Sequence, residues 1–454
     1  MLRCPRRARS CALVLCLAVL AAFGAPTARG QEATSADDPL LAPLAPAARQ
    51  LGSWEEAVAL QRAHSNDLRI AADELLRVRG QERSALGALL PNLTGSGVAS
   101  FTLLPAESGG EGSSGALFGT APYQTVSLTA GLAILDLRAW NALAQARGAT
   151  RVAQLSLADA RRVQTLSLAQ ALVAAVTAER LAELSRAGLR DALARQSLAD
   201  RANRGGASTE IDLARVRQDG EAARAQVVAA DETLRQARET LGLTLGLAEP
   251  VSVLPAFQLN GLAESERSGC RRIDAEAERP DQRAARERVR VAERAVNDVR
   301  AQYAPSVALR STAQAYLIPD SENFRVWNLQ AVLTVPLWDG GIREGALRAA
   351  KAQRSQAEER RELAARTAHV EVARAQRGIG VAESARAIAA RALTQAERND
   401  ALTRRAYDVG VGTSLELVTS AALLRQQQLN LALREFEVLR AKVAAIFSLS
   451  DCAS

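Results

Sequence analysis

The chain of 454 residues repeats itself, and this internal repeat narrows the possible folds more than any other feature. Pro91-Asn92-Leu93 resembles Pro305-Ser306-Val307, 214 positions later, and the glycine turn at Gly206 resembles the one at Gly410, 204 positions later. Neighbouring matches keep each offset, so we interpret the chain as two copies of one structural unit. The offset changes because the first copy carries an extra Gly- and Ser-rich loop around residues 107–119.

Each copy has the same internal order: a helix, two strands, a very long helix, a glycine turn and a shorter helix. Residues 138–203 and 343–408 contain no proline, and their larger apolar residues recur every three or four positions. A helix of that length would extend roughly 100 Å at 1.5 Å per residue. We therefore predict two antiparallel helical hairpins, at about 138–241 and 343–447, that pack as coiled coils through small side chains.

The segments before the long helices change to a period of two. Val126 and Leu128 alternate with Thr and Ser residues, and residues 306–317 and 326–337 alternate in the same way. We predict strand pairs at about 92–135 and 306–338, each with one apolar and one polar face. A hairpin packed on a soluble core would alternate too, so the pattern alone leaves both interpretations open.

Aromatic residues are few, 3% of the chain, and most of them lie in or beside the predicted strand pairs. They are Phe101, Phe118, Tyr123, Trp140, Tyr303, Tyr316, Phe324, Trp327 and Trp338. Bands of aromatic side chains mark the lipid–water interfaces of membrane strands. The candidate membrane-interface residues are Phe101, Tyr123, Tyr316, Trp327 and Trp338.

The number of strands limits how such a sheet could enter a membrane. Four strands cannot close a barrel, and an unpaired strand edge cannot face lipid. No segment after the N-terminal region reaches eighteen uninterrupted apolar residues, so no helical span is expected there. If the chain enters a membrane, several copies must therefore contribute strands to one barrel.

The first thirty residues have the pattern of a secretory signal peptide. Arginines through Arg9 precede the apolar run Cys11–Phe23, and small residues around Arg29 precede a cleavage point before Gln31. We expect a mature protein outside the cytoplasm that begins with a flexible Ala- and Pro-rich segment, 31–50. Without the signal peptide the excess of basic residues nearly vanishes, which argues against a nucleic-acid partner.

Two cysteines, Cys270 and Cys452, remain after the signal peptide. They could form a disulfide in an oxidising compartment, but residues so far apart in sequence do not establish a pair. The first repeat, the linker, the second repeat and the tail are expected at 51–249, 250–278, 279–449 and 450–454.

No catalytic signature is present. The chain has no HExxH, P-loop or GxSxG motif, and its two histidines, His64 and His369, stand apart. We therefore expect no enzyme activity, no cofactor and no metal.

Several motifs resemble those of the TolC family of outer-membrane efflux and export channels. They are Trp54-Glu55-Glu56-Ala57, Arg279-Pro280-Asp281, Pro91 and Pro305 before the strands, Val335-Pro336-Leu337-Trp338-Asp339-Gly340-Gly341, and Tyr407-Asp408-Val409-Gly410. The resemblance covers nearly all of the mature sequence. It implies a mainly helical fold with a small β part, and a homotrimer whose twelve strands form one outer-membrane β-barrel continuous with a periplasmic α-helical barrel.

The same resemblance implies a function and partners. It indicates a channel-tunnel in the outer membrane of a Gram-negative bacterium that exports substrates across the periplasm, in a tripartite efflux or type I secretion system. The implied partners are a periplasmic adaptor (membrane fusion) protein, an inner-membrane pump of the RND or ABC type, and outer-membrane lipid. The alternative is a soluble periplasmic coiled-coil adaptor or scaffold, which would not account for two aromatic-flanked strand pairs.

The resemblance also implies a periplasmic gate at the hairpin tips. Its candidate constriction residues are Asp212, Glu416, Tyr407 and Thr413, and its turns are Gly205, Gly206, Gly410 and Gly412. Carboxylates repeated by symmetry would attract cations and be blocked by divalent ions. Gly412 and Thr419 replace an arginine and an acid found in some members, so the closed state is expected to be held differently. An acid in the first helical turn also complements the helix dipole, and this structural role stays open for Asp212 and Glu416.

Overall fold

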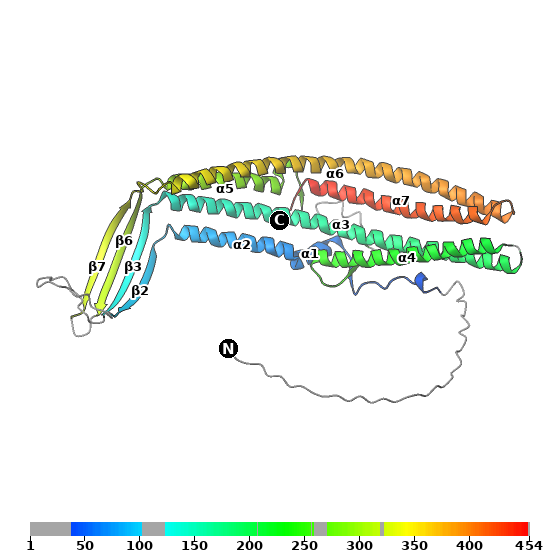
Figure 1. Cartoon of the computed structure of the whole chain (residues 1–454), viewed down its shortest axis with the longest axis horizontal. Helices are drawn as coiled ribbons and strands as arrows, with labels where there is room; N and C mark the ends of the chain where they lie inside the picture. Colours follow the sequence, from blue (N-terminus) through cyan, green and yellow to red (C-terminus); the bar gives the residue numbers. More distant parts are fainter. Residues whose placement is uncertain are drawn as a thin grey trace, which may run out of the picture.

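The computed structural model describes residues 38–101, 123–206, 208–255, 257, 270–317 and 322–452. The expected signal peptide and the loop around 107–119, with Phe118, lie outside the described residues. The molecule is long and narrow: a sheet at one end continues into helices that run to the opposite end (Figure 1).

The two copies supply equivalent elements. The first contains α1 (Trp54–His64), α2 (Asn66–Gly87), β2 (Asn92–Ser100), β3 (Tyr123–Leu135), α3 (Leu137–Arg204) and α4 (Glu210–Leu245). The second contains α5 (Pro280–Ala301), β6 (Ser306–Leu317), β7 (Phe324–Thr334), α6 (Ile342–Asp408) and α7 (Ser414–Ser448). Short elements are η1 (Pro39–Leu41), β1 (Arg49–Leu51), β4 (Val251–Val253), β5 (Arg271–Arg272), η4 (Glu276–Glu278) and β8 (Ser450–Asp451). The fold is mainly helical, as predicted.

One antiparallel sheet joins the two copies. Its strand order is β2-β3-β6-β7, and the central pair β3–β6 brings Leu132 opposite Leu309. Each outer strand, β2 and β7, has one neighbour among the described strands, so both outer edges are open. The alternation expected to continue to Leu337 stops earlier, at Thr334. Pro336 accounts for this end, because proline has no N–H to donate to a strand ladder.

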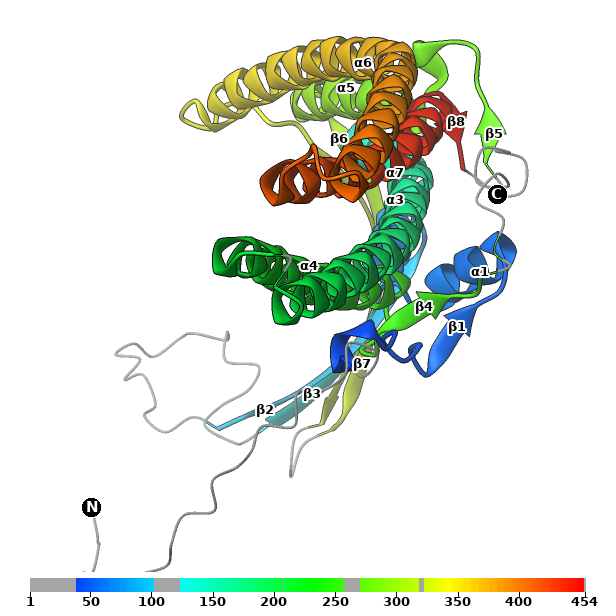
Figure 2. The ribbon, with the colours of Figure 1, turned by 90° about the vertical axis from the view of Figure 1, so that its right-hand side faces the viewer.

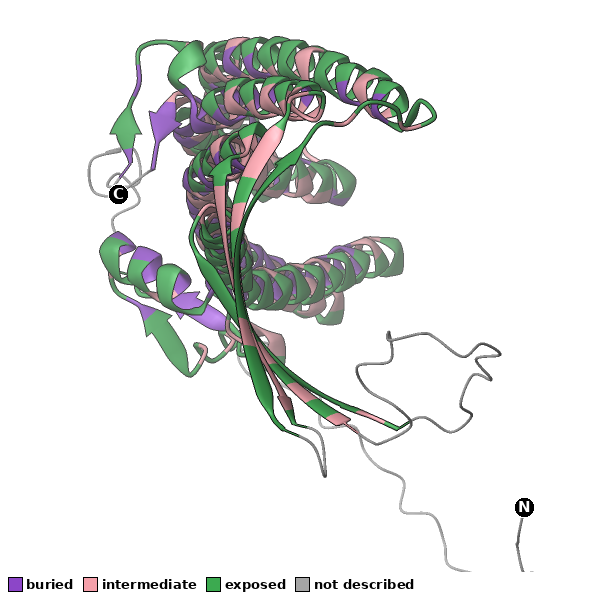
Figure 3. Cartoon of the chain, turned by 90° about the vertical axis from the view of Figure 1, so that its left-hand side faces the viewer, coloured by how far each residue is buried: buried purple, intermediate pink, exposed green. Residues whose placement is uncertain are grey.

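Neither face of this sheet is covered by a helix, and most of its residues are exposed or half-buried (Figure 3). No helix in the described ranges has the length and apolarity needed to cross a bilayer.

The helices bury their core near the middle of the molecule. Leu168 and Leu172 of α3, Leu241 of α4 and Phe447 of α7 are completely buried there, together with Leu51. Fully buried alanines in α3 allow neighbouring helices to approach closely. Each long helix starts at the sheet: the Asp136 carboxylate accepts a hydrogen bond from the backbone N–H of Ala139 at 3.1 Å and so caps α3.

Two small sheets lie on the convex side of the helical arc (Figure 2). Strand β1 pairs in parallel with β4, and β5 pairs antiparallel with β8. A disulfide joins Cys270 to Cys452 beside the second of these pairs, which resolves the pairing that the sequence left open.

The segment before β1, expected to be flexible, is held against the first hairpin in its described part. The Asp38 carboxylate pairs with Arg224 of α4 at 2.8 Å. Arg186 and Arg238 donate hydrogen bonds to the carbonyl oxygens of Ala42 and Ala45, at 3.2 and 2.8 Å. The side-chain pattern of the sequence could not predict these contacts, because in two of the three the acceptor is a backbone carbonyl oxygen, which every residue has.

The disulfide generates a stability prediction. It closes a loop between residues 182 positions apart, and cross-links of this kind contribute about 2–4 kcal/mol to the free energy of unfolding. Cys270→Ser should lower the thermal midpoint. Cys452→Ser should lower it equally, and the double variant should fall no further, because each change removes the same bond. Labelling of the wild type by a maleimide without prior reduction would contradict the pairing.

Candidate functional site

Two helical turns lie side by side at the end opposite the sheet (Figures 1 and 2). Gly205 and Gly206 connect α3 to α4, and Gly410 lies between α6 and α7. Gly206 has φ 75° and Gly410 has φ 80°, a left-handed conformation that glycine adopts without steric cost. The turn positions predicted from the repeat are therefore backbone requirements of both hairpins.

A capping box begins the second helix of each hairpin. Thr209 and Asp212 hydrogen-bond reciprocally at the start of α4, with the Asp212 N–H donating to Thr209 Oγ1 at 3.2 Å. Thr413 and Glu416 do the same in α7, where the Thr413 N–H donates to Glu416 Oε2 at 2.8 Å. Both candidate carboxylates thus have the structural role of helix caps.

The two carboxylates differ in what else they contact. The Ser414 hydroxyl of the second hairpin donates a hydrogen bond to Asp212 Oδ1 of the first, so Asp212 links the tips. This bond and those from Thr209 hold the pKa of Asp212 below its ordinary value. Among the described residues the Glu416 carboxylate accepts hydrogen bonds only within its own cap, and the Thr413 N–H lowers its pKa. No three His, Cys, Asp or Glu side chains in the described ranges are grouped as a metal site.

Gly412 and Tyr407 form the inner side of the second turn. A Cβ at position 412 would lie 2.9 Å from the Tyr407 backbone nitrogen, closer than real Cβ atoms normally approach. This crowding requires glycine here and excludes the arginine of some TolC family members from the same backbone. Tyr407 itself is half-buried in the last turn of α6.

A second link between the hairpins lies deeper, and the sequence analysis missed it. Arg425 of α7 donates to both carboxylate oxygens of Asp219 in α4, and Arg195 of α3 donates to Asp219 Oδ2 at 3.0 Å. Burial alone would raise the pKa of Asp219, but the hydrogen bonds and charges of the two arginines outweigh it and keep the pKa low. Between the two links, Val418 packs on the buried residues Leu213 and Val216.

The register of α4 contained a signal for this second link. Its buried positions Leu213 and Val216 are followed three residues later by Asp219 and then by Ala223. A carboxylate in the buried register of a helix needs a partner from a facing helix. We define the contacts of Asp212 with Ser414 and of Asp219 with Arg425 as the tip latch.

The candidate aromatic residues divide between the two faces of the sheet. Trp327, 78% exposed, lies opposite Ala313 on the apolar face, with exposed Leu329 and Leu333. Tyr316 stacks on Phe324 at 4.5 Å and lies on the polar face, because residues three apart in a strand point to opposite sides. Tyr316 and Trp327 therefore cannot both face lipid.

The remaining aromatic candidates lie at the two ends of the sheet. Phe101 and Tyr123 are at the end remote from the helices, whereas Trp338, 87% exposed, follows β7 at the helical end. Aromatic side chains thus lie at both ends of the sheet.

Comparisons with known proteins agree with this geometry. Residues 273–448 match the family model described as "Outer membrane efflux protein". The probable efflux pump outer membrane protein TtgC of Pseudomonas putida is 24% identical over 309 residues. That match covers 66% of this chain and 62% of the relative, so the chain matches less than two thirds of the relative's length.

Solved structures share the fold. A membrane protein from Pseudomonas aeruginosa superposes with a TM-score of 0.75 at 21% identity, covering 87% of this chain and 93% of the other. The outer membrane protein VceC from Vibrio cholerae gives 0.74 at 20% identity, covering 87% and 95%. These matches show that the chain has the fold of these two membrane proteins.

Breaking the tip latch should separate the hairpins. Arg425→Gln removes charge-assisted hydrogen bonds to Asp219, each contributing about 1.5–3 kcal/mol. Spin labels at the exposed Ile211 and Val409, in protein diluted with unlabelled chains, should then give a longer and broader distance distribution. Arg217→Gln is the matched control, because Arg217 pairs with Asp200 within the first hairpin at 3.1 Å. An unchanged distance in Arg425→Gln would contradict the latch.

The latch should also weaken in acid. Asp212 and Asp219 have lowered pKa values in the folded protein, against an ordinary value of 3.8. Their contribution is therefore complete above pH 3.8 and is lost as the pH falls through the lowered pKa. The label distance should stay constant from pH 7 to 5 and lengthen in stronger acid. In Arg425→Gln the distance should already be longer at pH 7, so the further change in acid should be smaller than in the wild type.

Proposed function

We propose that this protein is the outer-membrane channel of an export system, a tunnel that carries substrates from the periplasm or an inner-membrane pump to the outside. The matches to outer membrane efflux proteins, together with the resemblance noted in the sequence, support this function over a soluble adaptor. The proposed function is transport, and it involves no catalysis.

The observation that carries the proposal is the four-stranded sheet with two open edges. Its apolar face exposes large side chains such as Trp327, Leu329 and Leu333, and no helix covers them. Lipid can cover such a face, but the unpaired N–H and C=O groups of β2 and β7 need partners in a membrane. In a homotrimer, β2 of each copy pairs with β7 of the next, which gives twelve strands and leaves no open edge.

The helices extend this barrel as a periplasmic tunnel. α3 has 68 residues and α6 has 67, so each reaches roughly 100 Å from the sheet. Three pairs of hairpin tips then surround the periplasmic entrance, and the tip latch holds each pair closed. A periplasmic adaptor protein opens the entrance by separating the tips, and an inner-membrane pump of the RND or ABC type supplies the cargo.

Glu416 has the position of a constriction residue in this arrangement. Its carboxylate is exposed beyond its cap, and three copies around one axis would create a ring of negative charge. Asp212, half-buried and bonded to Ser414, contributes to closure instead.

Conductance in planar lipid bilayers tests the function. The purified wild type should form discrete channels that divalent cations block from the periplasmic side. Glu416→Gln should weaken this block about tenfold, because each lost charge in a close ring reduces cation binding by about 1 kcal/mol or more. Glu359→Gln removes an exposed carboxylate of α6 far from the turn and should leave the block unchanged. Unchanged block in Glu416→Gln would remove Glu416 from the constriction, and absence of channels would contradict the function.

A further inference from the structure

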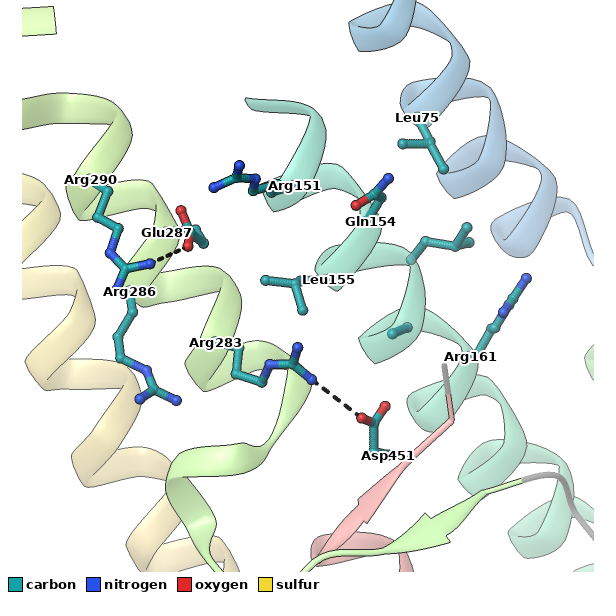
Figure 4. A pocket seen from close by; sticks show the side chains of 12 residues that line it. Leu75, Arg151, Gln154, Leu155, Arg161, Arg283, Arg286, Glu287, Arg290 and Asp451 are labelled. Carbon is teal, nitrogen blue, oxygen red and sulfur yellow. Dashed lines mark hydrogen bonds and ion pairs between the residues drawn. The ribbon is translucent and has the colours of Figure 1, made fainter. Parts of the chain in front are cut away.

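A pocket of about 640 Å³ lies between α3 and α5, above β8, away from the hairpin tips (Figure 4). Leu155 and Ala158 of α3 form part of its apolar wall, and Leu75 of α2 closes one side. Five arginines line it: Arg151, Arg161, Arg283, Arg286 and Arg290.

The positive charge of this pocket is only partly compensated. Its two carboxylates each pair with one arginine: Arg283 with Asp451 at 3.5 Å, and Arg290 with Glu287 at 2.5 Å. Arg151, from the opposite wall, makes no ion pair with any residue that the structure describes. Guanidinium groups converging from two helices favour bidentate binding of carboxylate or phosphate.

The two carboxylates also present unused acceptors. Asp451 is only 8% exposed, and its Oδ1 atom has no hydrogen-bond partner among the described residues. The Oε2 atom of Glu287, on α5, is also buried and has no hydrogen-bond partner among the described residues. A buried acceptor without a donor costs about 1–3 kcal/mol. A ligand that brings a hydroxyl or ammonium donor as well as negative charge can satisfy one of these acceptors if the carboxylate turns toward it.

The place of the pocket in the fold excludes a lipid headgroup as the occupant. Arg151 and Arg161 follow the start of α3 by 14 and 24 residues, which places them roughly 20–35 Å from the sheet. Asp451 belongs to β8, on the convex side of the helical arc (Figure 2). If the proposed function holds, this side faces the periplasm. A single copy forms the pocket, because both α3 and α5 belong to the same chain.

We propose that this pocket binds a small multivalent anion that also carries hydroxyl groups, of the hydroxy-polycarboxylate or sugar-phosphate class. The anionic groups bind Arg151 and Arg286 from opposite walls. A hydroxyl donates to Asp451 Oδ1 or to Glu287 Oε2. The site is on the outer surface, so its ligand is a periplasmic solute rather than cargo in the tunnel.

Calorimetric titration of the detergent-extracted full chain with citrate and tricarballylate tests the proposal. The two probes have the same three carboxylates, and only citrate has the hydroxyl. Citrate should bind saturably, one per chain, and about tenfold more tightly than tricarballylate. Arg286→Gln and Arg151→Gln should each weaken citrate binding about tenfold or more. Arg348→Gln, at an exposed pair with Glu344 on α6, is the control of equal charge change.

Each of the other outcomes would contradict one part of this proposal. Equal affinity for both probes would contradict the role of the carboxylate acceptors. Equal weakening by Arg348→Gln would reduce binding to general charge attraction, and no saturable binding of either probe would contradict the site. Because this titration needs neither channel activity nor a membrane, its failure is distinct from failure of the bilayer experiment.

Discussion

The open edges of the four-stranded sheet are the constraint on which the rest of the structure depends. On their outer edges, the backbone N–H and C=O groups of β2 and β7 have no strand partner in the part of the chain that the structure describes, and no helix covers the apolar face beside them. In water such an edge invites aggregation, and in lipid it is not tolerated. In the proposed homotrimer, pairing between identical copies would satisfy both edges at once, and lipid would cover the apolar face.

The sheet also determines how the two copies act together. Strands β3 and β6 pair antiparallel along most of their length, so α3, which follows β3, and α5, which precedes β6, meet the sheet at the same end and lie side by side. The main core lies halfway along them, near Leu168 and Phe447. Between this core and the hairpin tips, the two hairpins are joined by the contact of Val418 with Leu213 and Val216 and by the polar contacts of the tip latch. Since polar links between solvated helices are weaker than a packed core, we expect the tips to be the part that opens in the proposed channel.

Much of this architecture could be predicted from the sequence, because it follows periods of two and of 3.6 residues. The long helices, the strand pairs and the turns at Gly206 and Gly410 each have a local cause in side-chain pattern or backbone conformation. The Asp219–Arg425 contact could not be predicted as a pair, because nothing local fixes which helix faces α4. The packing of residues 38–51 on the first hairpin could not be predicted either, because it depends largely on hydrogen bonds to backbone carbonyl oxygens. The sequence alone could have placed Tyr316 and Trp327 on opposite faces of the sheet, because side chains alternate between the two faces along each strand.

Electron microscopy of the detergent-extracted mature protein tests the shared sheet most directly. The account predicts particles with threefold symmetry that are more than about 100 Å long, with a short barrel at one end formed from the sheets of three chains. Compact monomers, or soluble rods whose sheet folds back on their own helices, would contradict it.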